Sequence, residues 1–328
     1  MKFWYQSKWN IYAVMLSPLS LIVAAITKIK RYRRSVQSYP VPVIVVGNIS
    51  VGGTGKTPTI IWLANFLTSK GFSVGVVSRG YGARPNREFP IEVLSTDSAA
   101  QVGDEPALIR QKTMARVVID PNRDQAVKFL CQQGSQKPNL IISDDGMQHY
   151  RMARDIELLM VDPLRGFGNG KFLPAGPLRE STSRLGSVDF VLAKQEGPKL
   201  PKVEVQVATA KKLLAINSLQ QRLALQPIRI ASAIGNIDSF AQTVLNLGYA
   251  IIEQSEFRDH ALLPDGVLEE SRIPVVVTEK DYIKLRNPKA HIYYVPFEID
   301  FDDAFKKQLL KRIKETLSEK SNSHTCSI

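Results

Sequence analysis

Short runs of apolar residues alternate with longer amphipathic stretches along the first two thirds of the chain. Residues 56–70 place Ile60, Leu63 and Leu67 at helical spacing, and Gly71 then provides a helix stop. Apolar runs separated by helices are typical of parallel strands joined by crossovers. The pattern predicts an α/β protein with a doubly wound, mostly parallel sheet. Its strands are expected at 43–46, 74–77, 117–119, 140–142, 158–161 and 190–192.

The pattern changes after residue 200. Val203, Val205 and Val207 alternate with Glu, Gln and Ala, as in a strand with two different faces. We therefore expect this strand to pair with part of 213–225 as a hairpin-like connection. These patterns divide the chain into five parts. They are an N-terminal segment (1–40), a first α/β domain (41–200), a β-linker (201–226), a second α/β domain (227–320) and a disordered tail (321–328).

The second domain repeats the α/β pattern on a smaller scale. Its first helix is expected to begin near Ile237 and to end at Gly248, and residues 306–320 have the pattern of a closing amphipathic helix. A second, smaller α/β unit is therefore predicted. Its strands are expected at 228–234, 250–252, 275–277 and 292–295.

The N-terminal segment has an unusual distribution of charge. Residues 11–27 contain no charged side chain, aromatic residues precede them, and five cations follow at 28–34. A helix of this length would be ~25 Å long, slightly short of the ~30 Å bilayer core, and Pro18 interrupts it. Aromatic residues at one end and cations at the other favour a peripheral or monotopic membrane anchor. The alternative is a helix packed on the first domain.

Composition narrows the class of partner. The formal net charge is +12, and residues 1–40 hold seven Lys and Arg but no Asp or Glu. Because these cations flank one apolar segment, they indicate an anionic membrane surface and no nucleic acid. Cys131 and Cys326 are too few for a disulfide framework or a zinc site, which favours the reducing cytosol. The expected location is the cytoplasmic face of the inner membrane.

A glycine-rich stretch follows the first predicted strand and ends in Gly55-Lys56-Thr57. Glycines let backbone N–H groups surround a phosphate, the lysine reaches the β- and γ-phosphates, and the threonine hydroxyl can bind Mg²⁺. The stretch departs from the strict P-loop pattern because Ser50 stands where the first glycine is expected. A P-loop NTPase-like first domain is predicted. The expected ATP-binding residues are Ser50, Val51, Gly52, Gly53, Thr54, Gly55, Lys56 and Thr57.

Paired carboxylates follow the strand at 140–142. Asp144 and Asp145 would lie beside the glycine-rich loop and hold Mg²⁺, together with Thr57. Gln148 and His149 extend the same stretch and could orient phosphate or metal-bound water.

Several other polar groups follow predicted strands. Arg79 and Arg123 come after the second and third strands, and Arg179 and Glu180 lie in a proline-rich loop suited to an anionic substrate. Asp104 precedes Glu105-Pro106 and suits a helix start, but a carboxylate here could also accept a proton from an attacking hydroxyl. A single loop histidine such as His260 is most often a surface or packing residue.

Taken together, these motifs resemble the tetraacyldisaccharide 4'-kinase family of lipid A biosynthesis. The resemblance extends from the N-terminal apolar segment to about residue 285. The matching stretches, in chain order, are VGNISVGGTGKTP, SRGYG, GDEP, DPNR, DDGMQH, LPAGPLRE, RDH and TEKD. The chain departs from the family at Met147, where phenylalanine is usual, and at Ala261, where many relatives have a second histidine.

The resemblance implies ATP- and Mg²⁺-dependent phosphorylation of the 4'-hydroxyl of a membrane-borne, tetraacylated glucosamine disaccharide 1-phosphate, with no obligatory protein partner. It also implies two α/β/α domains with the active site between them. Asp104 and His260 would form the catalytic pair. The implied metal-linked residues are Thr57, Asp144, Asp145 and Glu180, and the implied substrate or phosphate residues are Arg79, Arg123, Gln148, His149 and Arg179.

An alternative is a P-loop ATPase or GTPase switch that acts on a protein partner. It would explain the GKT and DDG stretches, and Thr278-Glu279-Lys280-Asp281 superficially resembles a base-reading motif of GTPases. That stretch lies in the second domain, however, and its order differs by one residue. A switch also leaves the loops suited to an anionic substrate unexplained.

Overall fold

The structure is a computed structural model of the whole chain. It describes residues 2–5, 10–32, 38–134, 136–198, 200, 203–234, 237–269, 271–285 and 287–325. Trp9, Arg33 and Arg34 of the predicted membrane segment, and 326–328 of the predicted tail, lie outside these ranges.

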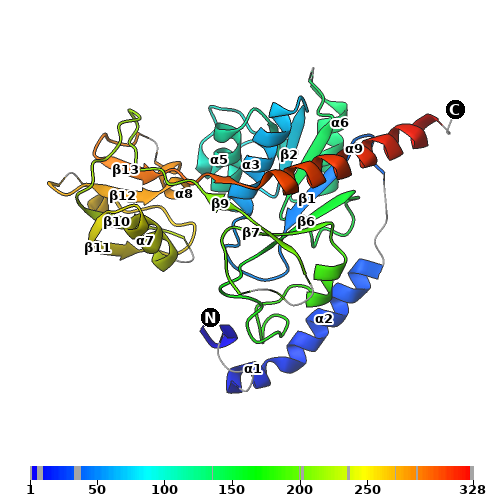
Figure 1. Cartoon of the computed structure of the whole chain (residues 1–328), viewed down its shortest axis with the longest axis horizontal. Helices are drawn as coiled ribbons and strands as arrows, with labels where there is room; N and C mark the ends of the chain where they lie inside the picture. The colour runs from blue at the N-terminus through cyan, green and yellow to red at the C-terminus, as the bar shows by residue number, and fades with distance from the viewer. Residues whose placement is uncertain are drawn as a thin grey trace.

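The first unit contains an eight-stranded sheet with the order β3-β4-β2-β5-β1-β6-β7-β8 (Figure 1). All neighbouring pairs are parallel except β3 with β4. The mostly parallel sheet is therefore confirmed. Its strands are β1 (Val43–Gly47), β2 (Val74–Ser78), β3 (Ile91–Glu92), β4 (Arg116–Ile119), β5 (Leu140–Asp144), β6 (Ile156–Val161), β7 (Phe190–Ala193) and β8 (Val205–Val207).

Because helices bury both faces of this sheet, its central strands appear in the sequence as continuous apolar runs. Alternate residues of β1 point to opposite faces. Ile44 belongs to one core cluster with residues of α3 (Lys56–Ser69) and α5 (Asp104–Lys112). Val45 belongs to a second cluster with residues of α6 (Arg123–Gln132). The short helices α4 (Ala99–Val102) and η2 (Thr182–Gly186) lie in the connections.

The second unit is a separate four-stranded sheet, drawn in yellow and orange in Figure 1. Its order is β11-β10-β12-β13 and every pair is parallel. Two apolar clusters cover its faces. The elements are β10 (Pro227–Ser232), α7 (Ile237–Asn246), β11 (Ala250–Glu256), η3 (Asp265–Val267), β12 (Val275–Thr278), α8 (Glu279–Tyr282) and β13 (Ile292–Val295).

The linker differs from the predicted hairpin. β8 adds to the edge of the first sheet, parallel to β7. The next strand, β9 (Thr209–Ala210), pairs antiparallel with β14 (Ile299–Asp300), which lies far along the chain. The predicted pairing with 213–225 is therefore wrong. Alternation of side chains indicates that a strand forms, but it does not identify the partner strand.

The closing helix belongs to the first unit. Helix α9 (Asp303–Thr325) crosses the first sheet in Figure 1. Phe305, Leu309 and Ile313 are buried in the core cluster that contains Ile60 of α3. The chain thus returns through β14 to the first unit, so the predicted second domain at 227–320 extends too far. Residues 321–325, predicted as disordered, continue this helix.

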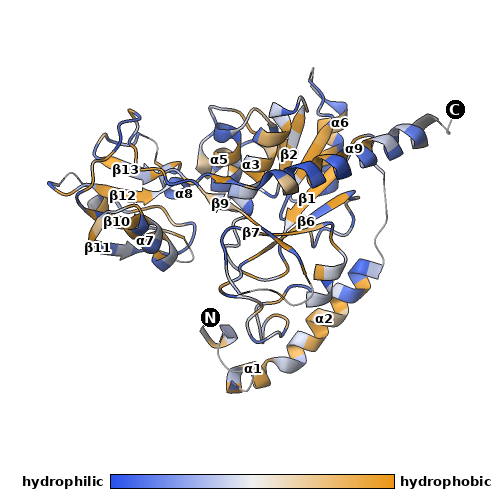
Figure 2. Cartoon of the chain, in the orientation of Figure 1, coloured by the Kyte–Doolittle hydropathy of each residue, from blue (hydrophilic) through white to orange (hydrophobic). Residues whose placement is uncertain are grey.

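The N-terminal segment forms η1 (Lys2–Tyr5), α1 (Ile11–Met15) and α2 (Ser17–Tyr32). Buried side chains and hydrogen bonds join it to the first unit, and Trp4 and Ala13 are buried. The Ser20 hydroxyl donates to Phe172 O at 2.6 Å, and Lys171 Nζ donates to Ser17 Oγ at 2.8 Å. Hydrophobic residues recur along α1 and α2 (Figure 2), and Met15 and Leu21 are 71% and 72% exposed. Among the described residues, no helix combines the length and apolar character needed to cross a membrane.

Candidate active site

The glycine-rich loop joins β1 to α3. Gly52 and Gly55 have φ angles of +137° and +89°, which favour glycine. Asn48, fully buried at the start of the loop, donates to Thr54 Oγ1 at 3.3 Å. The loop is also held from outside, because Val51 N donates to Pro177 O at 2.8 Å. Sequence reasoning missed Asn48, although a polar residue directly after a buried strand was the available signal.

Lys56, the first residue of α3, faces the paired aspartates. Its Nζ lies 3.6 Å from Asp145 Oδ1, and Arg179 Nη1 lies 3.0 Å from Asp145 Oδ2. Burial alone would raise the pKa of Asp145, but Lys56 and Arg179 outweigh it and hold that pKa below its usual range. The predicted loop lysine, acidic pair and Arg179 are thus brought together.

Asp144 has a different environment. It is buried at the end of β5, and Ser78 Oγ donates to its Oδ2 at 2.7 Å. Its other oxygen, Oδ1, has no hydrogen-bond partner. Burial, with the nearby charges of Glu105 and Asp145, raises the pKa of Asp144 to about 7. A buried carboxylate that lacks a hydrogen-bond partner on one oxygen is stabilised by a proton or by a bound cation. Within the described ranges, no three His, Cys, Asp or Glu side chains form a ready-made metal cluster.

Arg123 and His149 support the backbone around Asp144. Arg123 is buried at the start of α6 and donates to Asp144 O at 3.1 Å and to Asp120 O at 3.0 Å. His149 Nε2 donates to Pro121 O at 3.1 Å, and burial lowers the pKa of His149. These contacts fix the loop that carries the aspartates. Arg79 is exposed at the end of β2.

Glu180 is engaged by protein groups. Its Oε1 accepts from Gln148 Nε2 at 2.7 Å, and Arg184 Nε lies 3.1 Å from its Oε2. Gln148 Nε2 also lies 3.0 Å from Asn48 O, at the glycine-rich loop. Glu180 Oε1 orients Gln148, whereas Glu180 Oε2 has no hydrogen-bond partner, like Oδ1 of Asp144 and of Asp145. A metal-linked role for Glu180 therefore stays a prediction.

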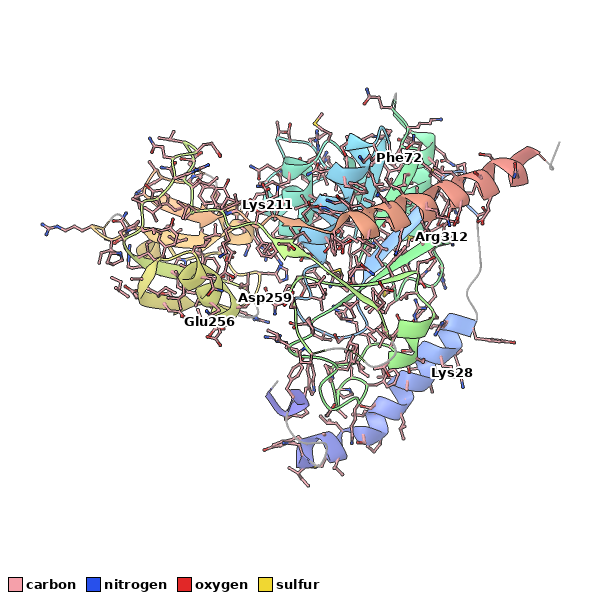
Figure 3. The ribbon with its side chains drawn as sticks, in the orientation of Figure 1. Lys28, Phe72, Lys211, Glu256, Asp259 and Arg312 are labelled. Atoms are coloured by element: carbon pink, nitrogen blue, oxygen red, sulfur yellow. The ribbon has the colours of Figure 1, made fainter. Side chains whose placement is uncertain are left out.

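The two units meet at Asp104 and His260. Asp104, the first residue of α5, is buried, and its Oδ2 lies 3.0 Å from His260 Nδ1. His260 adopts φ +65°, and its ring lies 5.1 Å from that of Tyr81. The neighbouring Asp259 projects from the second unit toward the first (Figure 3). The pair predicted from residues far apart in the sequence is therefore in contact.

Two lysines of the second unit surround the same carboxylate. Lys280 Nζ lies 3.6 Å from Asp104 Oδ2 and 3.1 Å from Glu105 Oε1. Lys284 Nζ lies 3.9 Å from Asp104 Oδ2, and the fully buried Asp281 holds it at 2.8 Å. Burial would raise the pKa of Asp104, but the His260 hydrogen bond and these lysines lower it overall. The sequence singled out TEKD without assigning Lys280 or Lys284 to the site.

Glu105 connects the two clusters. Its carboxylate pairs with Lys280, and its charge contributes to the raised pKa of Asp144. The Asp104–His260 pair, next to Glu105 in the chain and in space, therefore lies on the same side of the first unit as the acidic pair. A proton-accepting carboxylate next to a cradle for phosphate is the arrangement of a phosphotransferase, in which positioning and charge neutralisation perform most of the catalysis.

Comparisons with known proteins identify the family within this class. A family model described as tetraacyldisaccharide-1-P 4'-kinase matches residues 12–314, and the chain belongs to this family. The tetraacyldisaccharide 4'-kinase of Pasteurella multocida is 37% identical, covering 96% of this chain and 98% of the relative. That of Pseudomonas entomophila is 44% identical, covering 83% of each.

A solved structure agrees with this assignment. LpxK from Aquifex aeolicus in complex with ATP matches with a TM-score of 0.76 and 25% sequence identity, covering 93% of this chain and 99% of that one. The match spans both units, so the division into a larger and a smaller α/β unit is shared with a kinase structure that contains ATP.

Proposed function

We propose that the protein transfers the γ-phosphoryl group of ATP to the 4'-hydroxyl of a tetraacylated glucosamine disaccharide 1-phosphate, a step of lipid A biosynthesis. The observation that carries this proposal is the 3.0 Å contact between Asp104 and His260, beside Lys56 and the acidic pair. A hydrolytic switch has no need for a base that receives the proton of an alcohol. The pair therefore favours a kinase over the ATPase or GTPase alternative.

In the transfer step, the oxygen of the acceptor hydroxyl bonds to the γ-phosphorus, and Asp104 accepts the proton of that hydroxyl. The bond between that phosphorus and the bridging oxygen breaks, and ADP leaves. Because the pKa of Asp104 is lowered, this carboxylate is ionised at neutral pH and ready to accept. His260 holds it through Nδ1, and Lys56 neutralises charge on the transferred group. Backbone N–H groups of the loop from Ser50 to Thr57 bind the phosphates.

The residues present fit a magnesium ion. The buried Oδ1 atoms of Asp144 and Asp145 have no hydrogen-bond partner, and Mg²⁺ in such sites takes one or two carboxylates together with substrate phosphates and water. Asp144, Asp145 and the Thr57 hydroxyl would hold it. When bound, the ion neutralises the phosphate charge that develops during transfer.

The N-terminal helices suit an enzyme whose acceptor is a lipid. Large apolar side chains on α1 and α2 remain exposed, while Ser20 of α2 is hydrogen-bonded to the first unit. Exposed apolar patches with neighbouring cations bind membrane surfaces. We place the protein at the cytoplasmic face of the inner membrane, with α1 and α2 lying on the anionic bilayer.

A transfer assay tests the proposal. Purified protein, Mg²⁺ and γ-³²P-ATP are incubated with tetraacylated glucosamine disaccharide 1-phosphate in detergent micelles. Label should move to the lipid, and Lys56→Ala should abolish this transfer. Lys212→Met, which changes an exposed lysine of the linker, is the matched control and should leave transfer unchanged. Label released only as inorganic phosphate would instead support the ATPase alternative.

A further inference from the structure

The second sheet has a switch point of its own, between the adjacent strands β10 and β12 (Figure 1). From β10 the chain crosses to β11 on one side, whereas from β12 it crosses to β13 on the other. Such a point usually leaves room for a ligand at the carboxyl ends of the strands. Here a protein carboxylate takes that place. Asp281, in the short helix α8 directly after β12, is fully buried there.

Donors from both strand ends and from α8 surround the Asp281 carboxylate. Its Oδ2 accepts from Ser232 Oγ at 2.8 Å, from Ala233 N at 3.1 Å and from Thr278 Oγ1 at 2.7 Å. Its Oδ1 accepts from Lys284 Nζ at 2.8 Å. A cation and several hydrogen bonds compensate a buried carboxylate for the water it has lost. Because both oxygens are bound, the side chain and its donors form one rigid cluster.

This cluster also holds the backbone on both sides of His260. His260 N donates to Ala233 O at 3.1 Å, and the N–H of the same Ala233 donates to Asp281. On the other side, Lys284 Nζ donates to Ala261 O at 3.1 Å while Asp281 holds that ammonium. Asp281 therefore fixes one partner of the backbone at His260 and one at Ala261.

His260 needs such support. Its φ of +65° is an uncommon conformation for a residue with a side chain, and it persists only where the surroundings impose it. The reward is the 3.0 Å contact of His260 Nδ1 with Asp104 Oδ2 in the other unit. Hydrogen bonds weaken steeply with distance and angle. A small change of the backbone at His260 would therefore break this contact.

We propose that Asp281 is a positioning residue of the phosphoryl transfer, which holds the backbone around His260 so that the imidazole meets Asp104. The proposal rests on the proposed function, in which Asp104 accepts the proton of the acceptor hydroxyl. Because Asp281 is fully buried, it acts through Ala233 and Lys284 and not by contact with substrate. The TEKD stretch thus serves the kinase site, whereas the switch alternative would use it to read a base.

A double-mutant cycle tests this role, because a group that acts only through His260 has no effect once His260 is removed. kcat for transfer to the micellar acceptor is measured at pH 8 for the full chain with Asp281→Asn, with His260→Ala and with both changes. Asp281→Asn should lower kcat about tenfold when His260 is present and less than about twofold in His260→Ala. Asp265→Asn, which changes an exposed aspartate of η3 in the same unit, is the matched control and should leave kcat unchanged.

A milder variant keeps the test decisive if Asp281→Asn fails to fold. Ser232→Ala removes one donor to Asp281 Oδ2 and leaves Ala233 N in place. It should lower kcat about threefold when His260 is present and have no effect in His260→Ala. For either variant, equal losses with and without His260, or no loss when His260 is present, overturn the positioning role.

A second readout does not depend on activity. The hydrogen bond with Asp104 raises the pKa of His260. NMR titration of the ring, assigned by the signal lost in His260→Gln, should show this pKa falling toward its ordinary value of about 6.5 in Asp281→Asn and Ser232→Ala. Asp259 and Lys280, whose charges also act on the ring, are unchanged in these variants. An unchanged pKa overturns the positioning role, whereas a wild-type protein that transfers no phosphoryl group to the lipid overturns the proposed function.

Discussion

Replacement of Lys280 by methionine should change the pH dependence of the reaction. Lys280 Nζ lies 3.6 Å from Asp104 Oδ2. Coulomb's law at that separation gives about 1 to 5 kcal/mol for effective dielectric constants between those of water and a protein surface. Because Glu105 shares the same ammonium, we take the lower part of this range. It corresponds to about one pKa unit.

The direction of the pH shift follows because the ionised form of Asp104 is the active form. Its pKa is held below the usual value, so activity is present above that pKa and is lost as pH falls through it. Without Lys280 the pKa rises, and the acidic limb of the kcat/KM profile should move up by about one pH unit. The pKa of His260 should rise as well, because Lys280 lowers that pKa in the wild-type protein. The other charged groups near Asp104 are unchanged in this variant and comprise Glu105, Asp259, Asp281 and Lys284.

The assay is initial-rate phosphoryl transfer to the micellar acceptor between about pH 3 and 7, because the acidic limb follows an Asp104 pKa that lies below its usual value. Lys280→Arg keeps the charge and should leave the limb within a few tenths of a pH unit of wild type. If Lys280→Met lowers kcat without moving the limb, Lys280 does not act on Asp104 through its charge, and the reasoning fails.

Three further predictions concern stability, metal and membrane. Phe305→Ala empties a buried position between α9 and the first sheet. Urea denaturation should show a free energy of unfolding lower by about 3–5 kcal/mol. A loss below about 1 kcal/mol would contradict the docking of α9. Asp144→Asn removes a buried carboxylate whose pKa is about 7 and which is therefore charged at pH 8. At that pH the metal-free variant should have a higher melting temperature than metal-free wild type, and added Mg²⁺ should stabilise it less. A lower melting temperature of the variant would contradict this. Met15→Asp with Leu21→Asp changes two exposed side chains and should reduce co-sedimentation with anionic vesicles several-fold; unchanged binding would remove α1 and α2 as the membrane contact.

Much of the fold was predictable because its strands are buried on both faces. β1, β5 and β13 appear in the sequence as short apolar runs, and the structure places them at those positions. The connections were harder to predict. The pairing of β9 with β14, and the docking of α9 on the first sheet, depend on contacts between distant segments that local patterns do not contain.

The candidate site shows the same division. The glycine-rich loop and the aspartates after β5 are local patterns with a direct chemical meaning. Asp104 and His260 became a pair only through the resemblance to a family, since either residue alone fits a helix start or an ordinary loop. Lys280 and Lys284 carry no local signal, because lysine is common and only the fold brings them to Asp104.

Measurement of Asp104→Asn shows whether Asp104 accepts the proton of the acceptor hydroxyl. Asparagine preserves the shape of the side chain and its contact with Glu105 N but removes the base. We expect kcat for transfer to the lipid to fall at least about a hundredfold, while the Kd for ATP stays within about twofold of wild type. A kcat within a few-fold of wild type, with Lys56→Ala still inactive, would mean that Asp104 is not the base.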